Sequence, residues 1–78
     1  MYNRDDLRNW TLEAMTELRK ATPAEVAEYL WTHRRNKLEH SGKLLYTWQY
    51  DLRWAAMSLR GMGKLKPAER GKPWEVAS

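Results

Sequence analysis

Basic side chains, whose chemistry suits phosphate binding, are concentrated near the C-terminus of this 78-residue chain. Four of them fall within nine residues: Lys64, Lys66, Arg70 and Lys72. Residues 1–30 contain four basic and six acidic residues, a net charge of −2, whereas residues 31–78 contain ten and four, a net charge of +6. This asymmetry favours a polyanionic partner, with nucleic acid first and an anionic membrane surface second. A solvated basic surface without a partner is the alternative.

Residues that could perform catalysis or bind a metal are sparse. The chain has no Cys, and His33 and His40 lie seven positions apart with one Glu between them, which is not a recognised metal-ligand spacing. There is no glycine-rich phosphate loop and no nucleophile–base arrangement. Asp5 and Asp6 are better explained as charges at a helix start. We therefore expect no enzyme activity, no metal and no cofactor. No apolar run is long enough for a transmembrane helix, and we expect no membrane partner.

Two helices are expected in the first half of the chain. Asn3 is a good N-cap for a helix over 4–20. In Thr22-Pro23-Ala24-Glu25, a Thr at the N-cap is followed by Glu at the third helical position, which predicts a capping box and a helix over 23–37. The expected inward-facing residues are Leu7, Trp10, Ala14 and Leu18 in the first helix, and Val26, Ala27, Tyr29 and Leu30 in the second.

A third helix over 44–61 and a β-hairpin over 64–77 are expected in the second half. Eight apolar residues of this helical segment share a sector of about 120°: Leu44, Leu45, Trp48, Leu52, Ala55, Ala56, Leu59 and Met62. Ser41 or Thr47 is the expected cap, and Gly61 and Gly63 end the helix. Lys64–Lys66 and Trp74–Val76 alternate polar and apolar residues around a turn that contains Gly71, which predicts two paired strands. Trp10, Trp48 and Trp74 occupy good core positions, and Trp31 lies at an edge.

The expected fold is therefore mainly α with a small β-hairpin, in a single domain over 1–78. Three helices followed by a two-stranded hairpin resemble a winged helix-turn-helix domain. The residues that carry the resemblance are Asp51–Ala55, Leu59, Gly63–Leu65 and Arg70–Val76, which look like the recognition helix, glycine turn and wing of bacterial and phage winged-helix proteins. They are similar in particular to the N-terminal DNA-binding domain of Mrr-type restriction proteins. Nothing in the chain corresponds to a nuclease domain, so the resemblance implies no cleavage activity.

The resemblance implies that the third helix enters the major groove of double-stranded DNA. The base-contact candidates are Gln49, Tyr50 and Arg53, because they lie opposite the apolar sector and Arg and Gln pair bidentately with guanine and adenine. The candidate phosphate contacts are Lys43, Arg60, Lys64, Lys66, Arg70 and Lys72. Gly71 permits a tight tip that could bring Arg70 and Lys72 to phosphate or into the minor groove. A solvated helix face and an edge strand protected by charge are the alternatives.

Trp54 falls on the polar side of the third helix, where it could pack under the wing, stack on a partner or touch DNA. The function expected from these features is that of a small bacterial, phage or plasmid transcription regulator, cytoplasmic and associated with the nucleoid, acting as a monomer or weak homodimer. The main alternative is a protein–protein interaction module on the same scaffold, in which Trp31, Tyr50 and Trp54 form an apolar patch. RNA binding is a third possibility, although no dedicated RNA-reading motif is present.

Overall fold

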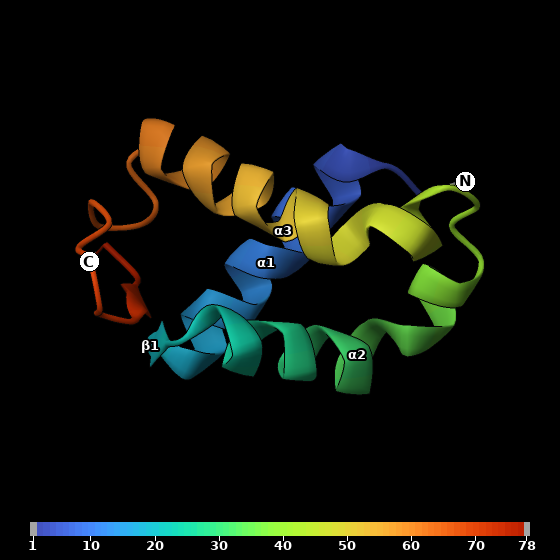
Figure 1. The fold of residues 1–78 in the computed structure, drawn as a ribbon, viewed down its shortest axis with the longest axis horizontal. Helices are drawn as coiled ribbons and strands as arrows, with labels where there is room; N and C mark the ends of the chain where they lie inside the picture. The colour runs from blue at the N-terminus through green and yellow to red at the C-terminus, as the bar shows by residue number, and fades with distance from the viewer. Residues whose placement is uncertain (1, 78) are drawn as a thin grey trace.

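The computed structural model describes residues 2–77 as three helices around one apolar core, with a small β-sheet at one end (Figure 1). The elements follow the order α1 (Arg4–Leu18), β1 (Lys20–Ala21), α2 (Pro23–Glu39), α3 (Leu44–Gly61) and β2 (Trp74–Glu75). The predicted fold class, mainly α with a small C-terminal hairpin, is confirmed. The bounds predicted for α3 agree with the structure, whereas α2 continues two residues beyond the predicted end at position 37.

Helix α1 is shorter than the sequence predicted, because the chain turns at Arg19. Asn3 caps the helix by accepting hydrogen bonds from the backbone N–H groups of Asp5 and Asp6. Arg19 has φ of 68°, and its N–H donates to the carbonyl of Met15 at 2.7 Å. The helix therefore ends at Leu18, and residues 20–21 form strand β1, which was not predicted from the sequence.

Helix α2 begins with the capping box that its sequence predicts. The Thr22 hydroxyl accepts from the Glu25 N–H at 3.2 Å, and the Glu25 carboxylate accepts from the Thr22 N–H at 2.9 Å. Helix α3 has no such cap: neither Ser41 nor Thr47 caps it, and Lys43 at the N-cap position makes no side-chain capping hydrogen bond. Ser41 is instead buried and donates to the carbonyl of Lys37, so it closes the turn between the two helices.

The core lies where the apolar sides of the three helices meet. Its members are Leu7, Trp10, Ala14 and Met15 of α1, Val26, Leu30 and Leu38 of α2, and Leu44, Trp48, Leu52, Ala55, Ala56 and Leu59 of α3, with Ala21 and Leu65 from the sheet region. Trp10 and Trp48 are buried as predicted. One prediction was wrong: Met62 is 54% exposed, because α3 has already ended there. Five other residues predicted to face inward are only partly buried: Leu18, Ala27, Tyr29, Leu45 and Trp74.

The hairpin (residues 64–77) pairs where predicted, but Lys64–Lys66 is not a regular strand: its pairing is one isolated bridge, and the two-stranded sheet is formed by β1 and β2. Leu65 pairs with Val76, the Lys66 N–H donates to the Glu75 carbonyl at 2.9 Å, and the Ala77 N–H donates to the Lys64 carbonyl at 3.0 Å. On its other side, β2 pairs antiparallel with β1, with Lys20 opposite Glu75 and Ala21 opposite Trp74. The last strand of the hairpin is therefore held between residues 19–21 and residues 64–66.

Candidate nucleic-acid interface

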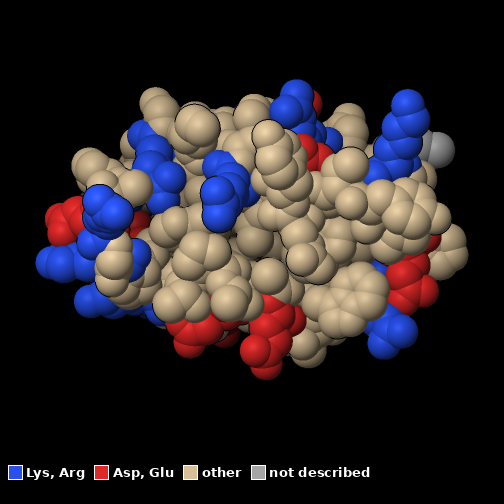
Figure 2. Space-filling model, viewed as in Figure 1, with Lys and Arg blue, Asp and Glu red and all other residues tan. Residues whose placement is uncertain are grey.

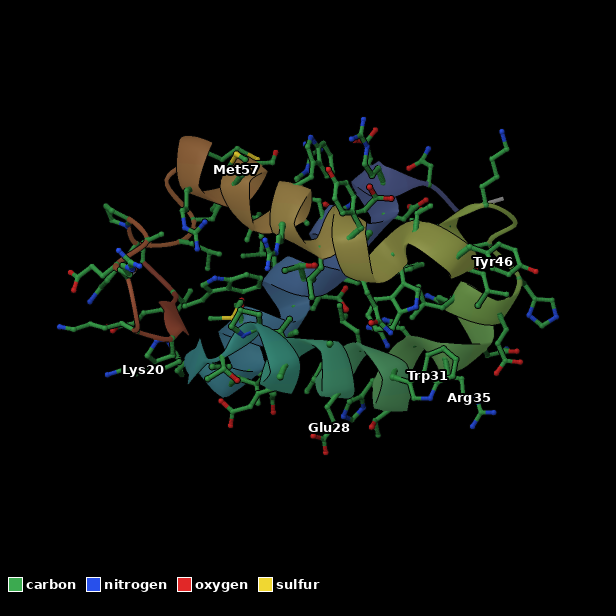
Figure 3. All side chains as sticks on the ribbon, in the orientation of Figure 1. Lys20, Glu28, Trp31, Arg35, Tyr46 and Met57 are labelled. Carbon is green, nitrogen blue, oxygen red and sulfur yellow. The ribbon has the colours of Figure 1, made fainter. Side chains whose placement is uncertain are left out.

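The side of α3 opposite the core is open to solvent and carries the predicted base-contact residues. Five exposed residues define this outer face: Tyr46, Gln49, Tyr50, Arg53 and Met57. Figure 3 shows Tyr46 and Met57 projecting outward near the two ends of the helix. Because the core stripe occupies the opposite side, the outward position of Gln49, Tyr50 and Arg53 agrees with the prediction. Tyr46 was missed, although its place four residues before Tyr50 puts both rings on one side of a helix.

Arg53 is the one cation among the five residues of the outer face. It is exposed, and within residues 2–77 its guanidinium makes neither an ion pair nor a hydrogen bond. The carboxylate that could have paired with it, Glu13 of α1, instead binds Arg34 of α2. Within residues 2–77, Arg53 therefore has no ion pair that would make it a structural residue, and its five N–H donors face solvent.

The basic residues of the hairpin divide into two classes. Lys66 pairs with Glu75, and the Lys72 Nζ lies 3.1 Å from a Glu69 carboxylate oxygen. Lys64 and Arg70 are exposed and, among the described residues, have no acidic partner. The hydrogen bond and charge of Lys66 hold the pKa of Glu75 below its ordinary value of 4.5, so this carboxylate is ionised at neutral pH and offsets part of the positive charge. Free positive charge on the hairpin is therefore centred on Lys64 and Arg70.

A tight turn holds Arg70 at the tip of the hairpin. The Lys72 N–H donates to the Glu69 carbonyl at 3.1 Å, which closes a β-turn around Arg70 and Gly71. Gly71 has φ of 77°, the left-handed value that the third position of a type II turn requires. Figure 2 shows Lys and Arg side chains gathered at the end of the molecule that carries the hairpin.

Arg60 connects α3 to the hairpin, and this limits its availability for phosphate. Its guanidinium carbon lies 5.6 Å from the centroid of the Trp74 ring, and its Nε is buried with no hydrogen-bond partner among the described residues. The side chain is half-buried. Arg60 is therefore a packing element between helix and strand rather than the exposed cation that the sequence predicted.

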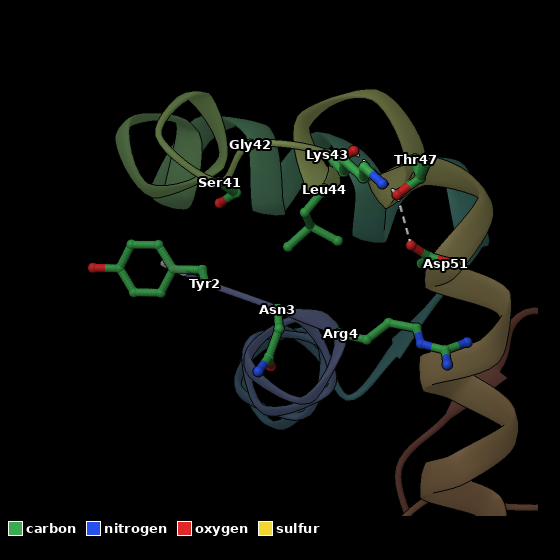
Figure 4. Close-up of a pocket in the computed structure, with 9 residues that line it drawn as sticks. All are labelled: Tyr2, Asn3, Arg4, Ser41, Gly42, Lys43, Leu44, Thr47 and Asp51. Atoms are coloured by element: carbon green, nitrogen blue, oxygen red, sulfur yellow. Dashed lines mark hydrogen bonds between the residues drawn. The ribbon is translucent and has the colours of Figure 1, made fainter.

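Lys43 lies at the opposite end of α3 from the hairpin, beside a pocket between the N-terminal segment and the start of α3 (Figure 4). Tyr2, Asn3 and Arg4 form one wall, and the turn before α3 forms the other. Within the pocket, the Thr47 hydroxyl donates to Asp51 at 2.8 Å. Lys43 is exposed, so α3 has an exposed cation before its first turn and others after its last.

Trp54 packs against α1, not under the wing. The guanidinium carbons of Arg4 and Arg8 lie 4.4 and 5.7 Å from its ring centroid, and the ring is half-buried. Trp31 has a different environment: its ring lies parallel to that of Trp48, 6.1 Å away, over a groove between α2 and α3. The apolar patch proposed for Trp31, Tyr50 and Trp54 is therefore not formed by contacts among these three residues.

Two further features bear on other classes of function. Across residues 2–77, no helix combines the length and apolar character needed to cross a membrane. In the same part of the chain, no group of three or more His, Cys, Asp or Glu residues is arranged to hold a metal ion. Comparisons with protein-family models, curated proteins and solved structures find no match.

Proposed function

We propose that this protein binds double-stranded DNA as a winged helix-turn-helix domain, with α3 in the major groove and the hairpin against phosphate or the minor groove. The observation that carries the proposal is Arg53, an exposed cation that has no partner within residues 2–77 and lies beside Gln49 and Tyr50 on the outer face of α3. Lys64 and Arg70, also unpaired in the described chain, follow directly after this helix.

Helix α3 has suitable dimensions for this role. Its 18 residues extend for about 27 Å, and the major groove of B-DNA is about 12 Å wide, enough for an α-helix. Arg53 can donate two hydrogen bonds to guanine, and Gln49 can pair with adenine. Lys64 and Arg70 supply phosphate contacts at the end of the helix. Under this proposal the protein is a small regulator of bacterial, phage or plasmid DNA, acting in the cytoplasm at the nucleoid.

The salt dependence of binding tests the electrostatic part of the proposal. Contact of Lys43, Lys64 and Arg70 with about three phosphates gives a slope of log K against log salt of roughly −3. Replacing Lys64 and Arg70 together with Ala should flatten this slope by about two units, measured by fluorescence anisotropy on a labelled duplex. The matched control is Arg35→Ala with Lys37→Ala, which removes two positive charges from α2 and should leave the slope unchanged. If the hairpin double variant and the α2 double variant changed the slope equally, the assigned role of the hairpin in phosphate binding would be contradicted.

Arg53 tests the sequence-reading part of the proposal. A duplex selected from a random pool should lose about 1–3 kcal/mol of binding free energy in Arg53→Ala, and random DNA much less. The melting temperature should not change, because the Arg53 side chain has no ion pair or hydrogen bond to lose in the described part of the chain. The opposite outcome, a lower melting temperature with an intact DNA preference, would make Arg53 a structural residue.

A second candidate function, a protein–protein interaction module, is favoured by large apolar side chains in solvent. Tyr46 is 85% exposed and Tyr50 81% exposed, both on the outer face of α3. A hydrophobic interface depends little on salt, whereas phosphate contacts depend on it strongly. The slope measured above therefore separates the two candidates.

A further inference from the structure

The outer face of α3 is apolar over most of its length, although its surroundings are cationic. Tyr46, Tyr50 and Met57 are 85%, 81% and 64% exposed. Single exposed apolar residues are ordinary, but three on one side of a helix form a patch, and such patches mark binding surfaces.

These apolar residues form one row together with Arg53. At 100° per residue, the four side chains fall within about 60° of the helix circumference, and at 1.5 Å per residue the row is about 16 Å long. Arg53 is its single charged member, with Tyr50 on one side and Met57 on the other. Figure 3 shows the row's terminal members, Tyr46 and Met57, directed away from the core.

The charges around the row indicate what kind of surface it fits. Lys43 precedes α3, and Lys64 and Arg70 follow it, all exposed and, within residues 2–77, without an acidic partner. The complementary surface is therefore anionic at its borders, contains one strong acceptor for Arg53, and is otherwise apolar. A wholly apolar protein surface would bury the Arg53 charge without a partner, which is costly. The major groove of DNA combines phosphate borders with guanine acceptors and one prominent apolar group, the thymine methyl.

We propose that Tyr46, Tyr50 and Met57 bind thymine methyl groups on either side of a guanine that is bound by Arg53. This inference rests on the proposed DNA binding and specifies its substrate: duplexes in which thymines flank a guanine. Tyr46 and Met57, neither of which was a candidate base contact, become specificity-determining residues. Discrimination at these positions depends on a methyl group, not on hydrogen bonds.

Deoxyuridine tests this directly, because it differs from thymidine only by lacking the methyl group. The probe is a duplex selected from a random pool with the wild-type protein, in which each thymine is replaced by deoxyuridine in turn. Each contacted position should weaken binding about fourfold, the worth of one buried methyl group. The slope against salt should not change, because no phosphate contact is lost.

Variants of the row assign each methyl group to a side chain. In each of the variants Tyr46→Ala, Tyr50→Ala and Met57→Ala, the loss of affinity caused by deoxyuridine should disappear at one position of the duplex and persist at the others. Met62→Ala is the matched control, because Met62 is 54% exposed but lies after the end of α3. This variant should show the same loss of affinity as the wild type at every deoxyuridine position. Circular dichroism confirms that the variants fold.

The outcomes separate this inference from the proposed function. If no deoxyuridine substitution weakens binding, the proposed contacts with thymine methyl groups are overturned, but DNA binding stands. Failure to bind any duplex overturns both. The free protein could instead dimerise in a concentration-dependent way. If Tyr50→Ala abolishes this dimerisation and leaves DNA affinity unchanged, the row binds a second copy of the chain, and the inference is overturned.

Discussion

Leu59 and Met57 provide a direct test of the rotation of α3, on which the whole interface depends. The two residues are two positions apart on the same helix, but Leu59 is 1% exposed and Met57 is 64% exposed. Leu59→Ala removes buried methyl groups and leaves a cavity, which costs about 2–5 kcal/mol of unfolding free energy. Met57→Ala changes only surface, so its effect should stay within about 0.5 kcal/mol.

These losses are large relative to the total stability of such a small chain. For 78 residues, the unfolding free energy is about 4–12 kcal/mol. Each kcal/mol shifts the melting temperature of a domain of this size by about 4–8 °C, so Leu59→Ala should melt at least about 8 °C lower than the unmodified protein. Urea unfolding followed by far-UV circular dichroism gives the free energies, and similar m-values in the two variants would confirm that the same unfolding transition is compared.

The result that would refute the assignment is a reversal of the two effects. If Met57→Ala were the destabilising change and Leu59→Ala were neutral, α3 would present its other side to the core. Arg53 would then face inward, and the base-reading role would fail with it. Equal, small effects would show that this part of α3 is not packed against α1 and α2.

Three further predictions concern the end of the molecule that carries the hairpin. Lys66 lowers the pKa of Glu75, so the stabilisation by this ion pair is present above pH 4.5 and is lost as the pH falls through the lower pKa of the folded state. An NMR titration of the Glu75 carboxyl should have its midpoint below pH 4.5, and this midpoint should move upward in Lys66→Met. Arg19→Gly should raise the unfolding free energy by on the order of 1 kcal/mol, because glycine adopts positive φ without strain; a lower melting temperature would contradict this. A double-mutant cycle with Arg60→Met and Trp74→Leu should give a coupling of about 0.5–2 kcal/mol, and additive effects would exclude the cation–π contact.

Local sequence signals predicted the helices well because short-range physics determines them. The capping box at Thr22 requires only residues three apart, and it appears in the structure as predicted. The apolar sector of α3 is similarly a property of one helix, which is why Arg53 was correctly placed on the outside. Strand β1 carried no comparable signal, because two residues are too few to show alternation. Its existence depends on Arg19, a non-glycine residue at positive φ, which sequence patterns do not predict.

The electrostatic character of the hairpin could not be predicted from its sequence, because it depends on pairing across strands. Lys66 and Glu75 are nine residues apart, and only the register of the hairpin brings them together. The separate pairing of β1 with β2 places Lys20 opposite Glu75, so this carboxylate faces two basic residues. A count of basic residues therefore overstates the charge that the hairpin can offer to phosphate. Within residues 2–77, Lys64 and Arg70 have no carboxylate partner, and for this reason their joint replacement is the sharpest test of phosphate binding by the hairpin.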